Sequence, residues 1–366
     1  MRNPFKPTAG ARPPLLIGRK NSLDGFKEAL DDGPGAPGLL TIITGPRGVG
    51  KTVLLTAAED FALRRGWVVV SETATVGLIS RLTVSIKKRA QEFGDGAPGR
   101  RVTAVVVGGL GVTTQLPPTT EPPWRETVTE LVTVLSVHET GLLITIDEIH
   151  AVNREELTEL AAVIQHLIRE DLPVGLIVAG IPKAVSELLN EDVSTFLRRA
   201  DRIDLDDIPI PDVEEAFAAT FLATGIVITR RQITLAAVAT GGYPFLIQLV
   251  GYHVWRRAVH GEISDVSLVE GIEAATRRLG ATVFHASMAD LSRVDRAFLL
   301  TMAEDNGPSR IASIATRLGE NTKYVGVYRG RLLDAGVIVS VGHGLLDFAM
   351  PHFRQYLREL VAADQD

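Results

Sequence analysis

The chain has 366 residues, a formal net charge of −6 and no cysteine, and its length predicts two to three domains. The absence of cysteine excludes disulfides, thiolate metal sites and cysteine nucleophiles, and the absence of a long apolar run predicts a cytoplasmic protein with no membrane partner. The acidic balance argues against a wholly basic nucleic-acid binder but allows a local basic patch.

The N-terminal segment, residues 1–15, is proline-rich and carries Arg2, Lys6 and Arg12, so it is predicted to be a flexible arm. A first domain is predicted over residues 16–208. It opens with Gly18-Arg19 and an amphipathic helix that begins near Ser22. The turn cluster at residues 31–38 ends this helix.

An apolar run at residues 39–44 leads into a glycine-rich loop of the pattern G-x-x-x-x-G-K-[ST], and a helix is predicted to follow over residues 52–65. Such a loop points backbone N–H groups at phosphate oxygens, while its lysine reaches the β- and γ-phosphates and its hydroxyl reaches Mg²⁺. The predicted nucleotide-binding residues are Gly45, Pro46, Arg47, Gly48, Val49, Gly50, Lys51 and Thr52. The chain is therefore expected to bind a nucleoside triphosphate. The alternative is a tight turn between a strand and a helix.

Further strands and helices alternate down to residue 205. This alternation predicts a parallel sheet with crossover helices on both faces. The predicted strands are 67–71, 142–147, 174–179 and 202–205, and the predicted helices are 76–93, 124–139, 154–169 and 182–190. Residues 102–107 and 111–116, separated by Gly108-Gly109, are predicted to form a hairpin insertion.

The strand at residues 142–147 ends in two adjacent carboxylates, Asp147 and Glu148. Asp147 is predicted to hold Mg²⁺ beside Thr52, and Glu148 to orient or deprotonate an attacking water, because hydrolysis of a triphosphate requires positioning and charge neutralisation. Lys51, Asp147 and Glu148 are thus the predicted catalytic residues, with ATP and Mg²⁺ as ligands. The alternative for the two carboxylates is a solvated helix cap.

Three arginines near the last strand, Arg198, Arg199 and Arg202, are candidates for an arginine finger directed at a phosphate. The alternative is a solvated helix end with cations near its C-terminus. Spacing does not select one of the three.

Beyond residue 208 the strands stop, and helices at 212–223, 230–239, 243–260 and 264–286 predict a helical lid over residues 209–287. Residues 288–366 are predicted to form a separate domain. Three helices (291–303, 309–318 and 321–335), a hairpin (337–341 and 345–349) and a closing helix follow the order of a winged helix-turn-helix.

From about Leu16 to Leu360 the chain resembles AAA+ ATPases of the origin-recognition and archaeal-ATPase type, and the related STAND NTPases. The glycine-rich loop and Asp147-Glu148 match the family's Walker A and Walker B motifs, and Gly18-Arg19 is similar to its N-terminal box on the adenine side. The segment at residues 240–245 resembles the family's GG-x-P lid signature, which implies that Pro244 lies near the nucleotide. The resemblance also implies a P-loop fold with a lid and a C-terminal winged helix.

The chain departs from this family in two places. Ala179-Gly180 stands where many such ATPases carry a polar side chain that senses the γ-phosphate, and the lid lacks the G-x-x-R arginine of replication initiators. Slow turnover, or a switch-like use of ATP, is therefore expected.

The predicted helix at residues 321–335 places Val325, Tyr328 and Leu332 on one face by helical periodicity. Between residues 310 and 331 there are five basic side chains and one acid, which fits phosphate contacts to double-stranded DNA. The candidate DNA contacts are Lys323, Arg329 and Arg331. Against this, residues 287–366 carry nine basic and ten acidic side chains, so a role in protein contact or self-assembly stays open.

The sequence therefore predicts an ATP-binding and slowly hydrolysing AAA+ ATPase that acts as a nucleotide-dependent switch and associates with DNA. The alternative is a STAND-like regulatory ATPase whose winged helix contacts a protein partner or a second copy of the chain.

Overall fold

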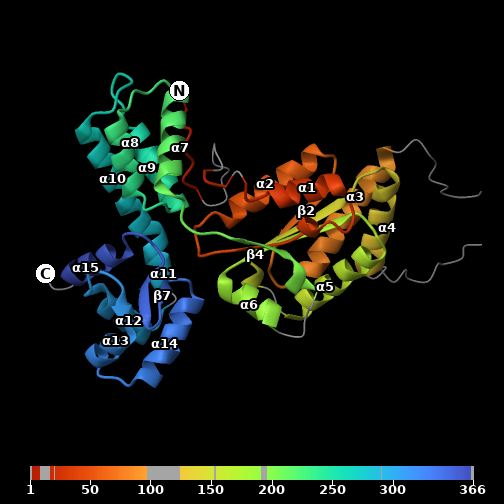
Figure 1. Ribbon diagram of the computed structural model, residues 1–366. Coiled ribbons are helices and arrows are strands. Elements are labelled where there is room, and N and C mark those ends of the chain that lie inside the picture. The colour runs from red at the N-terminus through yellow and green to blue at the C-terminus, as the bar shows by residue number, and fades with distance from the viewer. Residues whose placement is uncertain are drawn as a thin grey trace, which may run out of the picture.

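A five-stranded parallel sheet organises the first half of the chain (Figure 1). The computed structural model describes residues 2–8, 17–19, 21–96, 124–151, 154–190, 196–289 and 291–363. The strands, in the spatial order β2-β3-β4-β1-β5, are β1 (Leu40–Thr44), β2 (Val68–Thr73), β3 (Leu142–Asp147), β4 (Val174–Gly180) and β5 (Asp201–Asp204). The apolar runs of β3 and β4 are buried almost throughout, as expected for parallel strands with both faces covered.

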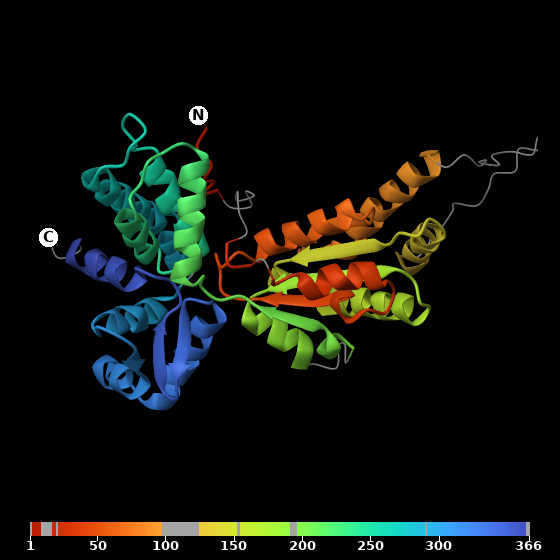
Figure 2. The ribbon, with the colours of Figure 1, turned by 45° about the horizontal axis from the view of Figure 1, so that its top comes forward.

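Helices cover both faces of this sheet (Figure 2). Successive residues of a strand point to opposite faces, so Ile42 packs in one hydrophobic cluster and Ile43 in the other. On the face of Ile43 lie α1 (Asp24–Asp32) and α2 (Lys51–Arg64). On the face of Ile42 lie α3 (Leu78–Gly96), α4 (Trp124–Val137), α5 (Arg154–Arg169) and α6 (Pro182–Asn190). Short 3₁₀ turns form at Pro37–Leu39, Ile149–Ala151 and Leu197–Arg199, and the predicted hairpin at 102–116 lies outside the described residues.

A narrow connection after β5 leads to a group of helices that we call the lid (Figures 1 and 2). Its members are α7 (Ile210–Ala223), α8 (Arg230–Ala239), α9 (Pro244–Trp255) and α10 (Asp265–Leu279). Thr229 and Gln232 form a capping box at the start of α8, and Pro244 occupies the first turn of α9, where its missing N–H is not needed.

The last part of the chain, which we call the C-terminal unit, combines four helices with a small antiparallel sheet of order β6-β8-β7. It contains α12 (Arg293–Ala303), β6 (Ser309–Arg310), α13 (Ile311–Leu318), α14 (Thr322–Asp334), β7 (Ile338–Gly342), β8 (Leu345–Phe348) and α15 (Phe353–Ala363). The predicted order of three helices, a hairpin and a closing helix is confirmed, whereas the two-residue strand β6 was not predicted. With the parallel sheet, this confirms the predicted fold class: a P-loop α/β core with helices on both faces, a helical lid and a winged helix-turn-helix.

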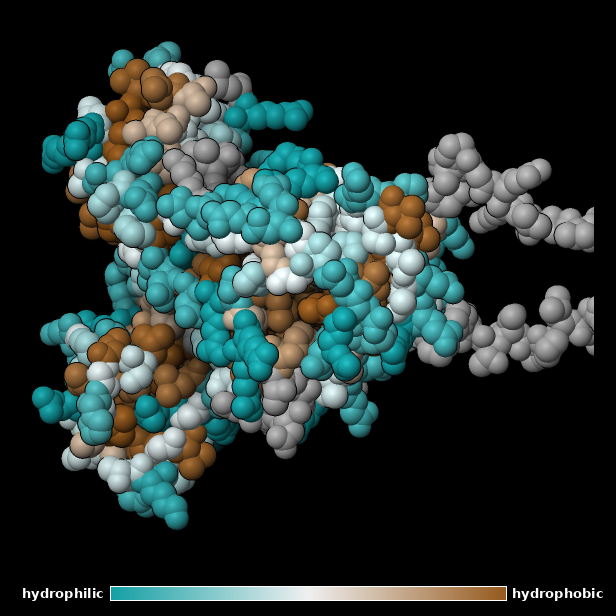
Figure 3. All heavy atoms as spheres, turned by 45° about the vertical axis from the view of Figure 1, so that its right-hand side comes forward, coloured by the Kyte–Doolittle hydropathy of each residue, from teal (hydrophilic) through white to brown (hydrophobic). Residues whose placement is uncertain are grey.

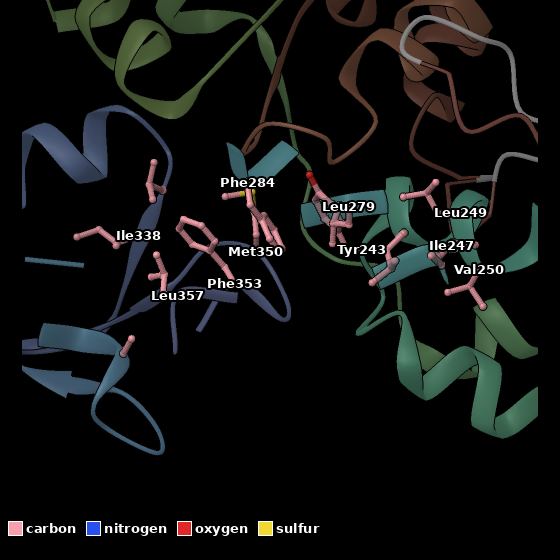
Figure 4. Packing of buried hydrophobic residues seen from close by; sticks show 14 of the residues in the cluster. Tyr243, Ile247, Leu249, Val250, Leu279, Phe284, Ile338, Met350, Phe353 and Leu357 are labelled. Carbon is pink, nitrogen blue, oxygen red and sulfur yellow. The ribbon is translucent and has the colours of Figure 1, made fainter. Parts of the chain in front are cut away.

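The lid and the C-terminal unit share one continuous hydrophobic core (Figure 4). Tyr243, Ile247 and Leu279 lie on its lid side, and Phe284 and Phe353 lie on the side of the C-terminal unit. Helix α10 continues through a π-helical segment, Gly280–Phe284, into α11, His285–Ala289. The boundary predicted at residue 287 therefore falls inside a helix.

Part of the arm that was predicted to be flexible packs against the lid. Phe5 is only 3% exposed and lies in edge contact with the ring of Phe217, with 5.8 Å between ring centroids. The Lys6 backbone N–H donates to the Gln248 side chain at 3.1 Å. Phe5 thus supplies an apolar anchor for residues 2–8 that the proline-rich composition does not reveal.

Hydrophobic side chains also reach the surface of the helical lid (Figure 3). Leu222 is 80% exposed, and Val238 and Val266 are also largely in solvent. None of the helices in the described parts of the chain combines the length and apolar character that spanning a membrane requires.

Candidate functional site

The glycine-rich loop connects the end of β1 to the start of α2. Gly48 and Gly50 have φ values of +76° and +100°, a region that side chains with a Cβ rarely adopt. Gly50 is the N-cap of α2, so the positive end of this helix faces the loop. The local structure thus provides backbone N–H groups and a helix N-terminus, which are suited to binding phosphate.

Lys51 is buried under this loop, with 6% of its surface exposed. Its ammonium group donates to the backbone carbonyls of Gly45 and Pro46, both at 2.9 Å. Burial lowers the pKa of Lys51, and the nearby carboxylates of Glu148 and Asp147 oppose that effect. Lys51 is therefore a desolvated donor held beside the loop, and a phosphate oxygen could replace the two carbonyls.

The hydroxyl of Thr52 and the carboxylate of Asp147 meet beside Lys51, although 95 residues separate them in the sequence. The Thr52 hydroxyl donates to Asp147 Oδ2 at 2.5 Å. The other oxygen of Asp147 accepts the backbone N–H of Glu148 at 2.8 Å. A hydroxyl and a carboxylate are suitable oxygen donors for Mg²⁺, which takes few ligands from the protein and the rest from phosphates and water.

In the described parts of the chain, no group of three or more His, Cys, Asp or Glu side chains could hold a metal ion. Thr52 and Asp147 offer two oxygen ligands, which would fit magnesium together with the phosphates of a bound nucleotide.

Glu148 follows β3 at a sharp turn, with a φ of +58°. This left-handed conformation is uncommon for a residue other than glycine and is often found at functional sites. Glu148 is half-buried, and its charge acts on the ammonium group of Lys51. Its carboxylate thus lies near the residues that the sequence assigned to the triphosphate.

The neighbouring strand β4 ends without a polar side chain. Gly180 faces Ile149, the residue after Glu148, and a Cβ built on Gly180 would lie 2.5 Å from Ile149 Cγ1. Any larger side chain at position 180 would have to displace Ile149. The departure noted at Ala179-Gly180 therefore has a packing reason.

The three arginine-finger candidates do not join the site within one chain. Arg198 and Arg199 precede β5, whose Asp201 pairs with Thr41 near the start of β1. The glycine-rich loop follows the opposite end of β1. Arg202 pairs with Ile42, and the Nε of Arg198 donates to the Leu189 carbonyl at 2.6 Å. Within this chain the structure thus leaves the three arginines away from the loop.

Gly18 and Arg19 lie at the connection between core and lid. A Cβ on Gly18 would lie 2.9 Å from Ile208 Cγ2, and the guanidinium of Arg19 donates to the carbonyl of Asp206. The backbone N–H of Ile208 donates in turn to the carbonyl of Gly242 in the lid signature, at 2.8 Å. Ile208 therefore joins the N-terminal box to the lid.

The lid reaches the glycine-rich loop through Tyr243, the residue before Pro244. Sequence reasoning assigned no role to Tyr243 or Ile208. Their position next to the lid glycines was the available signal, but a tyrosine and an isoleucine in such a place are ordinary core residues.

The predicted DNA contacts on α14 have different environments. Lys323 is exposed, whereas Arg331 forms an ion pair with the buried Asp295, at 3.0 Å. The Nε of Arg329 is buried and has no hydrogen-bond partner among the described residues. A Cβ on Gly330 would meet no described atom within 4 Å, so this glycine does not serve close packing within the described chain.

Comparisons with known proteins find similarity to family models in two parts of the chain. A family model described as an AAA ATPase domain matches residues 15–178. A second model, described as a domain of unknown function (DUF8462), matches residues 281–357. No curated protein matches the sequence.

Several solved structures share the fold over almost the whole chain. The Walker-type ATPase of Pyrococcus abyssi aligns with a TM-score of 0.65 and 16% identity, covering 94% of this chain and 96% of the other. The ORC2 protein of Aeropyrum pernix, in ADPNP-ADP complexes, aligns with a TM-score of 0.64 and 14% identity, covering 98% of each chain. Cdc6p of Pyrobaculum aerophilum aligns with a TM-score of 0.51 and 13% identity, over 98% and 97% of the two chains. Residues 15–178 thus match the AAA ATPase domain, and the fold of the chain is similar to those of archaeal Walker-type ATPases and ORC/Cdc6 proteins.

Proposed function

We propose that this protein binds ATP with Mg²⁺, hydrolyses it slowly and uses the nucleotide as a switch. The observation that carries the proposal is the contact between Thr52 and Asp147 beside the buried ammonium group of Lys51. A glycine-rich loop, a lysine, a hydroxyl and a carboxylate in this arrangement supply the groups that phosphoryl transfer requires.

Each residue has a distinct task in this proposal. Lys51 exchanges the carbonyls of Gly45 and Pro46 for phosphate oxygens, and Thr52 and Asp147 hold Mg²⁺, which neutralises phosphate charge when it is bound. Glu148 orients the attacking water and accepts its proton. Because Gly180 and Ile149 leave no polar group at the end of β4, turnover is expected to be slow.

We further propose that the C-terminal unit binds double-stranded DNA through α14. The exposed Lys323 and the half-buried Arg329 support this role, since cationic groups on an exposed helix face suit phosphate oxygens. Arg331 contributes less than predicted, because it already pairs with Asp295.

The test is binding of a labelled DNA duplex at increasing salt, with ATP, ADP or no nucleotide. We expect affinity to fall steeply as salt rises, and Lys323→Ala to reduce the slope of log K against log salt by about 1. Glu320→Gln is the matched control, because it changes the charge of the residue before the N-cap of α14. We expect it to keep the wild-type slope of log K against log salt. Absence of duplex binding by the ATP-loaded protein at low salt would reject the DNA assignment.

A second candidate is a regulatory ATPase whose output is a protein partner or self-assembly. The exposed apolar side chains of the lid, Leu222, Val238 and Val266, favour this candidate because such side chains are common in protein contacts. Measuring molecular mass with ATP and with ADP separates the two: a nucleotide-dependent change in mass without duplex binding would favour the regulatory ATPase.

A further inference from the structure

Tyr243 connects the lid to the glycine-rich loop. Its side chain is 2% exposed and belongs to the hydrophobic core shared by the lid and the C-terminal unit (Figure 4). Its hydroxyl donates to the backbone carbonyl of Arg47 in the loop, at 3.1 Å. Burial, with a smaller effect from Asp207, raises the pKa of Tyr243 above its usual value, so the hydroxyl stays protonated and remains a donor.

The contact between Tyr243 and the loop is close. A Cβ built on Gly48 would lie 1.9 Å from the Tyr243 hydroxyl oxygen, so only glycine at this position allows the ring to approach. Two consecutive loop carbonyls, those of Gly45 and Pro46, accept from Lys51, and the next one, that of Arg47, accepts from Tyr243. Lys51 must leave its carbonyls to bind a phosphate, whereas Tyr243 has no such competing task.

On its other side, the turn that carries Tyr243 contacts the C-terminal unit. Gly241 has a φ of +58°, and a Cβ on it would lie 3.0 Å from the Cβ of Pro351. His352 Nε2 lies 2.8 Å from the carbonyl of Ala239, so this nitrogen carries the proton and donates. Pro351 and His352 directly precede α15.

The lid turn thus lies between two partners, the glycine-rich loop and the segment before α15. A displacement of the loop changes the position of the Arg47 carbonyl, and the buried ring of Tyr243 cannot follow without moving the turn. Packed interiors respond to such shifts as units, because few voids are available to absorb them.

We propose that Tyr243 is a positioning residue that holds the glycine-rich loop through the Arg47 carbonyl and transmits the occupancy of this loop to the C-terminal unit through Gly241, Pro351 and His352. This inference rests on the proposed binding of ATP. It adds a residue and a route by which the nucleotide controls the C-terminal unit.

The experiment is hydrogen–deuterium exchange of the full-length protein with and without Mg-ATP, followed in peptides covering residues 45–52 and 349–356. In the wild type, ATP is expected to slow exchange in both. In Tyr243→Phe, which removes only the hydroxyl, ATP at saturation still protects residues 45–52, but the response at 349–356 falls by at least half. Affinity for ATP falls about fivefold, as expected for the loss of one buried hydrogen bond.

Tyr252→Phe is the matched control, because it removes a hydroxyl from α9, the helix that follows Tyr243. The hydroxyl of Tyr252 accepts from Arg256 and does not contact the loop. This variant is expected to behave as the wild type. His352→Ala tests the far end of the route without touching the loop, and it should lose the response at 349–356 while keeping the wild-type affinity for ATP.

An ATP response at 349–356 that is undiminished in both Tyr243→Phe and His352→Ala would overturn the inference while leaving ATP binding intact. If Tyr243→Phe does not fold, the result with His352→Ala decides alone. A wild type without any response at residues 45–52 would overturn the proposed ATP binding, and the inference with it.

Discussion

At the carboxyl edge of the sheet, polar side chains from different elements lie close together, whereas several basic side chains of the C-terminal unit form ion pairs with separate partners. Thr52, Asp147 and Lys51 come from two elements and meet at the end of β1 and β3. In the C-terminal unit, Arg331 pairs with Asp295, and Arg317 pairs with Asp305. The side chains at the sheet edge lie around a common point, whereas the ion pairs of the C-terminal unit connect parts of that unit to one another.

This difference shows that a cluster of basic residues in a sequence does not by itself identify a binding site. A parallel sheet brings the carboxyl ends of its strands to one edge, so residues far apart in sequence must meet there. A helix face fixes only which side chains point outward. Whether a basic side chain there is available to a ligand depends on neighbours such as Asp295, which lies on α12.

Glu148→Gln is expected to give the largest effect. Removing the proposed base should reduce ATP turnover about 100- to 10,000-fold, because general base catalysis contributes on this scale. ATP affinity should stay near that of the wild type, since the glycine-rich loop and Lys51 are unchanged. Steady-state hydrolysis and equilibrium binding measure the two quantities.

Glu155→Gln provides the control for this variant, because Glu155 is an exposed carboxylate in the first turn of α5. It should hydrolyse ATP at the wild-type rate. Undiminished turnover in Glu148→Gln would remove Glu148 from the mechanism and weaken the contrast between the two regions.

Arg331→Ala is expected to affect stability rather than DNA binding alone. It leaves the carboxylate of Asp295, which is 1% exposed, without its cation, although Ser292 still donates to it. We expect a loss of about 1–3 kcal/mol, the cost of an unsatisfied buried polar group. Lys323→Ala, on the exposed face of the same helix, should stay within about 0.5 kcal/mol of the wild type. Urea unfolding measures the free energy of unfolding of both variants. Equal values would show that Arg331 is as available to a ligand as Lys323.

The ion pair of Arg317 predicts a small dependence of stability on pH. The Arg317 guanidinium holds the pKa of Asp305 below its usual value of about 3.9. The contribution of this pair is therefore present above that value and is lost as pH falls through the lower pKa of the folded state. Since Asp305 is partly exposed, the contribution should be below about 1 kcal/mol. The free energy of unfolding of Asp305→Asn should lack this pH-dependent contribution. If the variant and the wild type show the same dependence of this free energy on pH, the assignment is contradicted.

The sequence predicted the order of the elements and the fold class well, because these follow from periodicity. It also placed the glycine-rich loop between a strand and a helix, as the structure has it, whereas nucleotide binding by the residues of this loop stays a prediction. It did not predict that Phe5 anchors the N-terminal segment, since a single aromatic residue in a proline-rich stretch gives no periodic signal. Arg198 and Arg199 precede β5, at the end of the strand that lies away from the glycine-rich loop. This position depends on strand pairing, which spacing along the chain does not give. The roles of Tyr243 and Ile208 depend on contacts between lid and core, which only the three-dimensional arrangement reveals.

The central claim is that the loop around Lys51, with Thr52 and Asp147, holds a nucleoside triphosphate with its magnesium ion. Calorimetric titration of the wild type with ATP, with and without Mg²⁺, tests it most directly. We expect saturable binding that Mg²⁺ strengthens and that Lys51→Ala abolishes. If the folded wild type takes up no ATP in the presence of Mg²⁺, or if Lys51→Ala binds equally well, the claim is contradicted.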